Sequence, residues 1–222
     1  HTMIYIVGYV PLVAAAGLFL ALLLNQKLRF TSFYRTAFFL PVVSSWVSVA
    51  LLWRWLFNPM TGPINFLLGL VGIQGPAWLY DPKWAMPAVI VTSVWKDAGF
   101  IAVIYLAGLQ AIPTEYYEAA AIDGSSALNR FRRITLPLLT PTTFFVVVIS
   151  MISSFQVFDQ VFIMTEGGPG GATTVLAERI FRHAFRYGRM GYAAAYSWLL
   201  FVLIFAVTLI QHRFQRSWVH YE

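Results

Sequence analysis

An all-α, polytopic membrane protein is the fold class that this sequence predicts. Of its 222 residues, 59% are hydrophobic and only 11% are charged, whereas about a quarter of the residues in a soluble domain are charged. The mean hydropathy is correspondingly high, at +0.69. The apolar residues form long continuous runs and not the alternating pattern of a transmembrane strand, so we expect helices to cross the bilayer.

Five apolar runs in the sequence have the length that a spanning helix needs, about 20 residues. They cover residues 3–24, 36–57, 84–109, 138–164 and 190–211. The second run contains Pro41. Residues 58–83, which follow it, are rich in Pro, Gly and Trp around a short apolar piece at 64–70. This piece is too short to span, and we expect it to lie in the membrane interface or to re-enter the membrane.

The positions of lysine and arginine predict the orientation of the chain in the membrane. The side expected to be cytoplasmic carries Lys27, Arg29, Arg35, Arg130, Arg132, Arg133, Arg213 and Arg216. The opposite side carries a slightly smaller set, Arg54, Lys83, Arg179, Arg182, Arg186 and Arg189. With this orientation His1 lies outside the cell and the tail lies inside it.

The cytoplasmic loop at about residues 110–137 predicts a helix, a turn and a second helix. Pro113 suits the start of the first helix, and Gly124 is placed to end it or to let the chain reverse. Ser125 or Ser126 can cap the second helix. The small alanines between these points allow another protein to approach closely. The shape therefore suits docking and not catalysis.

Part of this loop resembles the EAA signature of the permease subunits of binding-protein-dependent ABC importers. The residues that carry the resemblance are Glu118, Ala119, Ala120, Gly124, Ile134, Leu136 and Pro137, at the spacing of that signature. In that family the loop forms a coupling helix that fits a cleft on the ATPase subunit. The resemblance implies that the ATPase contacts are made by Glu118, Ala119, Ala120, Asp123 and Gly124.

Other stretches resemble the carbohydrate-type branch of the same family. They are residues 39–41, 106–110, 112–113, 158–159, 167–169 and 191–195. The resemblance implies a single permease domain over residues 1–222, with the ABC type I importer permease fold, in the bacterial inner membrane. Such permeases usually have six core spans, so we expect six in the full protein, with the usual first span absent from this sequence.

The sequence lacks the G-x-x-x-x-G-K-[ST] phosphate loop of an ATPase, and its glycine run at 167–171 has no following lysine. We therefore expect no enzymatic activity, no catalytic residue and no cofactor bound by this chain. The resemblance implies a second homologous permease subunit, two ATP-binding subunits that hold ATP and Mg, and an extracytoplasmic solute-binding protein. Membrane lipid is the other expected partner, and nucleic acid is not expected. The absence of cysteine and the scattered histidines predict no metal site.

Charged residues near the middle of a span are costly and usually functional. Lys96 and Asp97 occupy such positions in the third run, and as neighbours they point about 100° apart on a helix. They are therefore not a simple pair. A solute pathway or gate explains them, and so does pairing with another helix or subunit. The same two interpretations, with sugar stacking or packing for the aromatic rings, apply to Phe155, Gln156, Phe158 and Asp159.

Four arginines recur at helical spacing and predict one basic stripe: Arg179, Arg182, Arg186 and Arg189. A solvated or lipid-headgroup face explains the stripe. The sharper interpretation is attraction of an anionic solute, above all by Arg182 and Arg186, because arginine pairs well with phosphate. The tail at 213–221 also resembles glycerol-phosphate importer permeases. Glycerol 3-phosphate or a glycerophosphodiester is thus favoured over a neutral disaccharide or oligosaccharide.

Two other functions compete with the importer. An ion-coupled secondary transporter would use Lys96 and Asp97, and a non-transporting membrane scaffold would only assemble partners. The secondary transporter leaves the pattern over residues 112–137 unexplained, and the sequence gives no positive sign of a scaffold.

Overall fold

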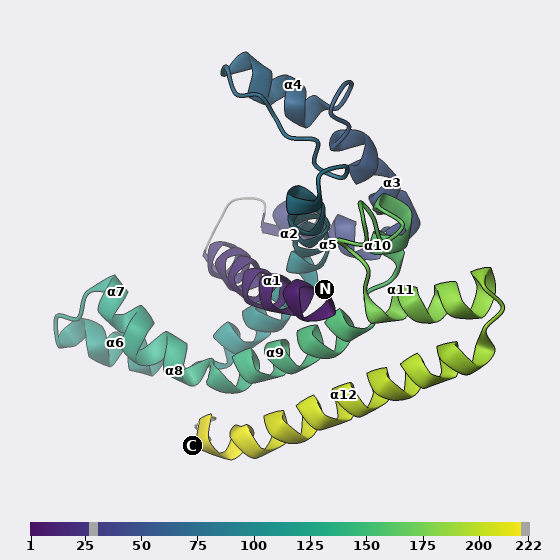
Figure 1. Ribbon diagram of the computed structural model, residues 1–222. Coiled ribbons are helices and arrows are strands. Elements are labelled where there is room, and N and C mark those ends of the chain that lie inside the picture. Colours follow the sequence, from purple (N-terminus) through teal and green to yellow (C-terminus); the bar gives the residue numbers. More distant parts are fainter. Residues whose placement is uncertain (27–30, 219–222) are drawn as a thin grey trace.

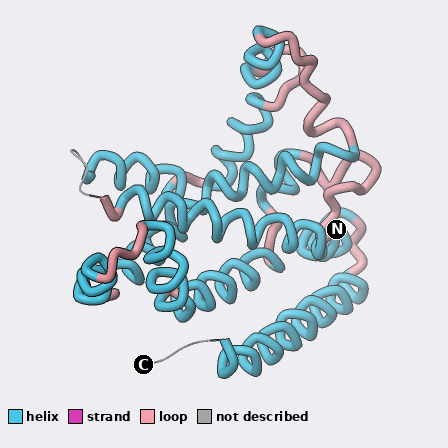
Figure 2. Tube along the Cα trace, turned by 90° about the vertical axis from the view of Figure 1, so that its left-hand side faces the viewer, coloured by secondary structure: helices cyan, strands magenta, loops and turns pink. Residues whose placement is uncertain are grey.

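The computed structural model describes residues 1–26 and 31–218, which are helical with connecting loops and contain no strand (Figures 1 and 2). The expected all-α fold is confirmed. Lys27, Arg29 and the end of the 213–221 tail lie outside the described residues.

Three helices match expected spans in length and apolar character. They are α1 (Thr2–Leu24), α5 (Pro82–Ala111) and α12 (Met190–Trp218). The centre of the bundle is formed by α1, which packs along α5 and against α9 (Figure 1). In contrast, α12 runs along the outside of α9, and almost none of its apolar span is buried.

The second expected span is broken, so the prediction of one helix over residues 36–57 is wrong. α2 (Thr31–Val43) and α3 (Trp46–Leu56) meet at an angle of 97°. Ser45 begins α3 by accepting a hydrogen bond from the backbone N–H of Val47 at 3.3 Å. Such a serine cap competes with a continuous helix, and the apolar character that predicted the span does not report this competition.

The fourth expected span is also shorter than residues 138–164. α8 (Leu136–Leu138) lies in a helical segment bent by 62° from α9 (Thr140–Phe155). After α9 the chain unwinds over residues 156–158, and α10 (Asp159–Met164) then packs against α3. The Ser154 hydroxyl bonds to the Ser150 carbonyl at 2.5 Å, a side-chain contact that weakens a helix near its end.

The loop between α5 and α9 has the expected helix–turn–helix form and projects from the bundle (Figure 1). α6 (Thr114–Ile122) is followed by Gly124, whose φ of +71° is a conformation that glycine adopts without strain. α7 (Ala127–Arg130) is capped by Ser126, so of the two candidate serines it is Ser126 that serves. A π-helical turn, η1 (Phe131–Thr135), then leads to α8.

The apolar piece at 64–70 forms a short helix, α4 (Pro63–Leu70), at the tip of a projecting segment (Figure 1). Asn65 organises this segment. Its amide nitrogen donates to the carbonyls of Pro59 and Pro76 at 3.3 and 3.2 Å, and its carbonyl accepts from the Trp78 ring nitrogen at 2.7 Å. The interfacial position of α4 stays a prediction.

The four arginines do not form one stripe on a regular helix. α11 (Leu176–Phe181) passes into a π-helical turn, η2 (Arg182–Arg186), and Gly188 with a φ of +62° then separates it from α12. A π-helix changes the angular spacing of side chains, and the turn reorients the last arginine.

Candidate functional site

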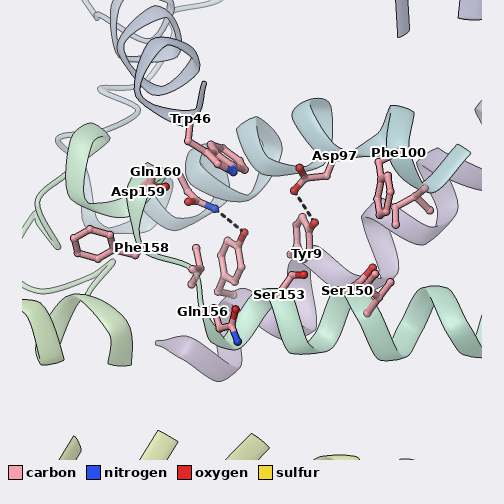
Figure 3. A pocket seen from close by; sticks show the side chains of 14 residues that line it. Tyr9, Trp46, Asp97, Phe100, Ser150, Ser153, Gln156, Phe158, Asp159 and Gln160 are labelled. Carbon is pink, nitrogen blue, oxygen red and sulfur yellow. Dashed lines mark hydrogen bonds between the residues drawn. The ribbon is translucent and has the colours of Figure 1, made fainter. Parts of the chain in front are cut away.

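A polar cavity of about 220 Å³ lies among α1, α5, the start of α3 and the break between α9 and α10 (Figure 3). α1 contributes Tyr5 and Tyr9, and α3 contributes its first residue, Trp46. The unwound residues 156–158 form one wall. Non-helical backbone is tolerated at membrane depth only where it is buried in protein or lines a cavity.

Hydrogen bonds join the walls of the cavity across several helices. The Tyr9 hydroxyl donates to Oδ2 of Asp97 at 2.7 Å, which links α1 to α5 (Figure 3). Tyr5 stacks on Tyr9 with ring centroids 5.3 Å apart. The Gln160 amide on α10 donates to the hydroxyls of Tyr5 and Ser93, both at 3.3 Å. The lining is therefore a connected network that presents phenols, an amide and a carboxylate.

Four of the predicted pathway residues line this cavity: Asp97, Gln156, Phe158 and Asp159. Phe155 is fully buried at the end of α9 and belongs to the core instead. α9 ends at Phe155, so Phe155 faces the core, whereas Gln156, Phe158 and Asp159, which follow the end of the helix, line the cavity.

Lys96 points away from Asp97, as its place on the helix predicted. Its ammonium donates to the backbone carbonyls of Pro41 and Val42 at 3.2 and 3.1 Å and lies 4.9 Å from the centre of the Trp46 ring. Among the described residues, no salt bridge joins Lys96 to a carboxylate.

Arg182 and Arg186 do not line the cavity, and both are occupied by carboxyl groups. Arg182 forms an ion pair with the buried carboxylate of Glu178 and donates to the carbonyl of Glu166 at 2.7 Å. Arg186 pairs with the side chain of Glu166 at 3.1 Å. These contacts join η2 to the glycine-rich loop. A structural role therefore explains both arginines without an anionic solute.

Sequence reasoning missed Tyr5, Tyr9, Trp46 and Gln160. The two tyrosines are four residues apart on one helix face, a spacing that could have marked them as a polar edge within an apolar span. Trp46 had no such signal, because it reaches the cavity only through the bend before α3.

The loop between α5 and α9 offers a second candidate site, on the outside of the molecule. Glu118, Ala119, Asp123 and Gly124 are exposed there, whereas Ala120 is half-buried. Ile122 is 86% exposed, which leaves an apolar side chain at the tip of α6 without cover from the described residues. The hydroxyls of Tyr117 and Thr135 lie 2.9 Å apart and hold α6 against η1.

No group of three or more His, Asp or Glu side chains in the described part of the chain is arranged to hold a metal ion.

Comparison with protein families gives a match over nearly the whole chain. Residues 14–220 match the family described as "Binding-protein-dependent transport system inner membrane component". The probable ABC transporter permease protein YesP of Bacillus subtilis (strain 168) is 42% identical over 225 residues, which cover 100% of this chain and 72% of YesP. The trehalose/maltose transport system permease protein MalF of Thermococcus litoralis is 37% identical over 201 residues, 90% of this chain and 68% of MalF.

A third relative bears on the anionic alternative. The sn-glycerol-3-phosphate transport system permease protein UgpA of Agrobacterium fabrum is 36% identical over 215 residues, which cover 95% of this chain and 73% of UgpA.

Solved structures agree with the sequence comparisons. A chain of a bacterial alginate ABC transporter, in complex with an alginate pentasaccharide-bound periplasmic protein, superimposes with a TM-score of 0.87 and 27% identity over 97% of this chain and 76% of that chain. A chain of the MetNI methionine ABC transporter superimposes with a TM-score of 0.64 at 18% identity, over 97% of this chain and 92% of that chain, a likeness of fold alone.

Proposed function

Because the chain belongs to the family of binding-protein-dependent transport system inner membrane components, we propose that it carries a neutral saccharide through the cavity between α1, α5 and α10. It is a multi-pass permease subunit of a sugar ABC importer, and the ATPase is a separate subunit. The family implies the inner membrane as its location.

The position of the cavity is the observation that carries the proposal. In secondary transporters, solute sites are typically built at breaks in spanning helices, where unwound backbone faces a cavity. The physical reason applies to any permease, because non-helical backbone at membrane depth must be buried in protein or line a cavity. Here the break between α9 and α10 and the bend before α3 meet at one polar cavity. The remaining surface of the spans is largely apolar, so this cavity is the natural path for a polar solute.

The side chains in the cavity favour a neutral polyhydroxyl solute. Asp97 and Asp159 accept hydrogen bonds from hydroxyls and repel an anion, and Trp46 offers a face for the apolar side of a sugar ring. The Phe158 ring is not available for this role, because it stacks on Phe162 and packs against Phe181. Among the described lining residues there is no lysine or arginine. Glycerol 3-phosphate remains the alternative, supported by the likeness to UgpA.

The loop between α5 and α9, which we expect on the cytoplasmic side, supports the proposal that transport is coupled to ATP. The exposed segment from Glu118 to Gly124 docks on an ATP-binding subunit and passes its motion to α5 and α9. A complete importer then contains a second permease subunit, two ATP-binding subunits with ATP and Mg, and an extracytoplasmic binding protein. A periplasmic protein accompanies the alginate transporter that resembles this chain.

Uptake into liposomes that contain the assembled complex tests this function, with ATP inside and binding protein outside. We expect ATP-dependent uptake of a neutral disaccharide and none of glycerol 3-phosphate. Uptake of glycerol 3-phosphate alone would replace the neutral saccharide with the anionic alternative. Uptake of either solute without ATP would overturn the importer mechanism itself.

A pair of matched variants tests the cavity. Ser153→Trp places a large ring in the cavity, and Ser48→Trp makes the same change at an exposed position on α3 that does not line it. The first variant should lose uptake while it still assembles with the ATPase, and the second should keep uptake. Normal uptake by Ser153→Trp would place the pathway elsewhere.

A further inference from the structure

Lys96 is a buried cation without a carboxylate partner among the described residues. It is 4% exposed and lies near the middle of α5. Its nearest acidic neighbour in sequence, Asp97, is bonded to Tyr9 instead. Burying an ammonium is costly unless hydrogen bonds compensate it, so the acceptors that it does contact are informative.

Those acceptors are the last carbonyls of a helix. The Lys96 ammonium bonds the carbonyls of Pro41 and Val42, in the final turn of α2. Carbonyls at a helix C-terminus have no partner within the helix and carry partial negative charge. The Pro41 carbonyl also accepts from the backbone N–H of Ser44 at 3.2 Å. The ammonium adds a charged donor to both carbonyls at the point where a continuous helix from α2 into α3 would have supplied backbone N–H groups.

The same ammonium also touches the other side of the bend. It lies 4.9 Å from the ring centre of Trp46, the first residue of α3, and this ring lines the cavity (Figure 3). Close packing supports the contact, because a Cβ added at Gly99 would stand 2.1 Å from the carbonyl oxygen of Phe38. α2 therefore lies directly on α5, one turn away from Lys96.

We infer that Lys96 is a positioning residue, whose ammonium holds the bend between α2 and α3 and thereby sets the Trp46 ring against the cavity. The inference rests on the proposed function, because the position of Trp46 matters for transport only if the solute passes through this cavity. Asp97 and Lys96, adjacent in sequence, thus act on different parts of the site.

The geometry of the bend can be measured directly, because the chain has no cysteine of its own. Spin labels are attached to Tyr34→Cys on α2 and Trp55→Cys on α3, both exposed positions, and the distance between them is measured by pulsed electron resonance in the assembled complex. In Lys96→Met we expect the distance to lengthen and broaden, by up to about 10 Å if the two helices straighten. Lys96→Arg keeps a donating cation and should restore the native distance.

Transport is measured on the same variants. Lys96→Met should raise the half-saturating concentration of the disaccharide by about fivefold, the loss that one aromatic contact represents, with a smaller change in the maximal rate. Lys96→Arg should recover the native value. Lys83→Met, which removes an exposed lysine of the same helix, should change neither quantity.

The two measurements separate the inference from the proposed function. A native label distance in Lys96→Met overturns the positioning role, whatever the uptake. A longer label distance together with an unchanged half-saturating concentration would support the conclusion that Lys96 holds the bend between α2 and α3. It would refute the role of Trp46 in the cavity. If Lys96→Met fails to assemble, Lys96→Gln, which keeps an uncharged donor group, takes its place and should give an intermediate distance. Absence of ATP-dependent uptake in the unmodified protein would instead contradict the proposed function.

Discussion

The two ion pairs in the described part of this chain differ widely in how much they are expected to contribute to the stability of the fold. Glu178 is 1% exposed and is paired with Arg182, whereas Glu166 and Arg186 form their ion pair in a solvent-exposed position. Exposed ion pairs are typically worth about 0–1 kcal/mol. Removing one partner of a buried pair leaves an uncompensated charge and costs about 3–5 kcal/mol.

Arg182→Met should therefore destabilise the protein much more than Arg186→Met. Thermal unfolding of the complex in detergent gives the comparison, with a clearly lower midpoint expected only for the first variant. Adding Glu178→Gln to Arg182→Met should recover part of the loss, because the buried charge is then absent. Equal midpoints for the two arginine variants would contradict the distinction.

For individual residues, the sequence identified the polar side chains within the spans better than it identified the groups that they contact. Asp97, Gln156 and Asp159 were recognisable because polar groups are rare within apolar runs, and they do line the cavity. Lys96 was recognisable for the same reason, but its partners are backbone carbonyls of another helix. Backbone carbonyls occur at every residue, so no side-chain pattern could have identified them.

Among the elements, the loop between α5 and α9 is the one that the sequence described best. Proline, glycine and serine gave its helix boundaries, because each acts on the backbone locally. The breaks in the second and fourth spans were missed, because hydropathy indicates whether a segment lies in lipid or in water. It does not indicate whether the helix through that segment is continuous. Ser45 and Ser154 act on the backbone where those helices begin or end.

Two variants test the loop as a docking element. Glu118→Ala should leave the complex assembled but lower solute uptake at least about tenfold, the loss expected for about 1.4 kcal/mol of contact. Glu115→Ala, an exposed glutamate on the same helix, is the control and should retain uptake. Comparable loss in both variants would mean that α6 tolerates no change in charge, and the specific role of Glu118 would be wrong.

Gly124→Val tests the turn in the same loop. A β-branched side chain at a φ of +71° is strained, by about 1–3 kcal/mol. ATP hydrolysis by the complex should then become less dependent on solute and binding protein. Hydrolysis that stays fully stimulated by both would show that the turn is not part of the coupling.

The packing of α2 on α5 gives a separate prediction for glycine. Gly99→Ala places a methyl group against the backbone of α2, where overpacking typically costs about 1–3 kcal/mol. Gly191→Ala on α12 meets no atom within 4 Å and should be neutral or slightly stabilising. Thermal midpoints of the two variants in detergent check this, and equal midpoints would refute the close approach at Gly99.

For the molecule as a whole, composition was enough to predict a helical membrane protein. The number of apolar segments followed from length alone, and three of the five correspond to long helices with nearly the expected bounds. The cavity was not predictable as a place, because it requires two breaks that are distant in sequence to meet. One follows Val43 and the other follows Phe155. Only the tertiary arrangement of α1, α5 and α10 brings them together.

The sparse packing of α12 has a mechanical consequence. A helix held mainly by α9 and α11 resists extraction less than α5, which is enclosed by several neighbours. When a cantilever pulls the chain out of a bilayer from its C-terminus, α12 should leave first and at a lower force than the α5 segment. A partner that packed on the outer face of α12 would raise this force, so comparing the unfolding trace of the single chain with that of the complex tests whether this face is covered on assembly.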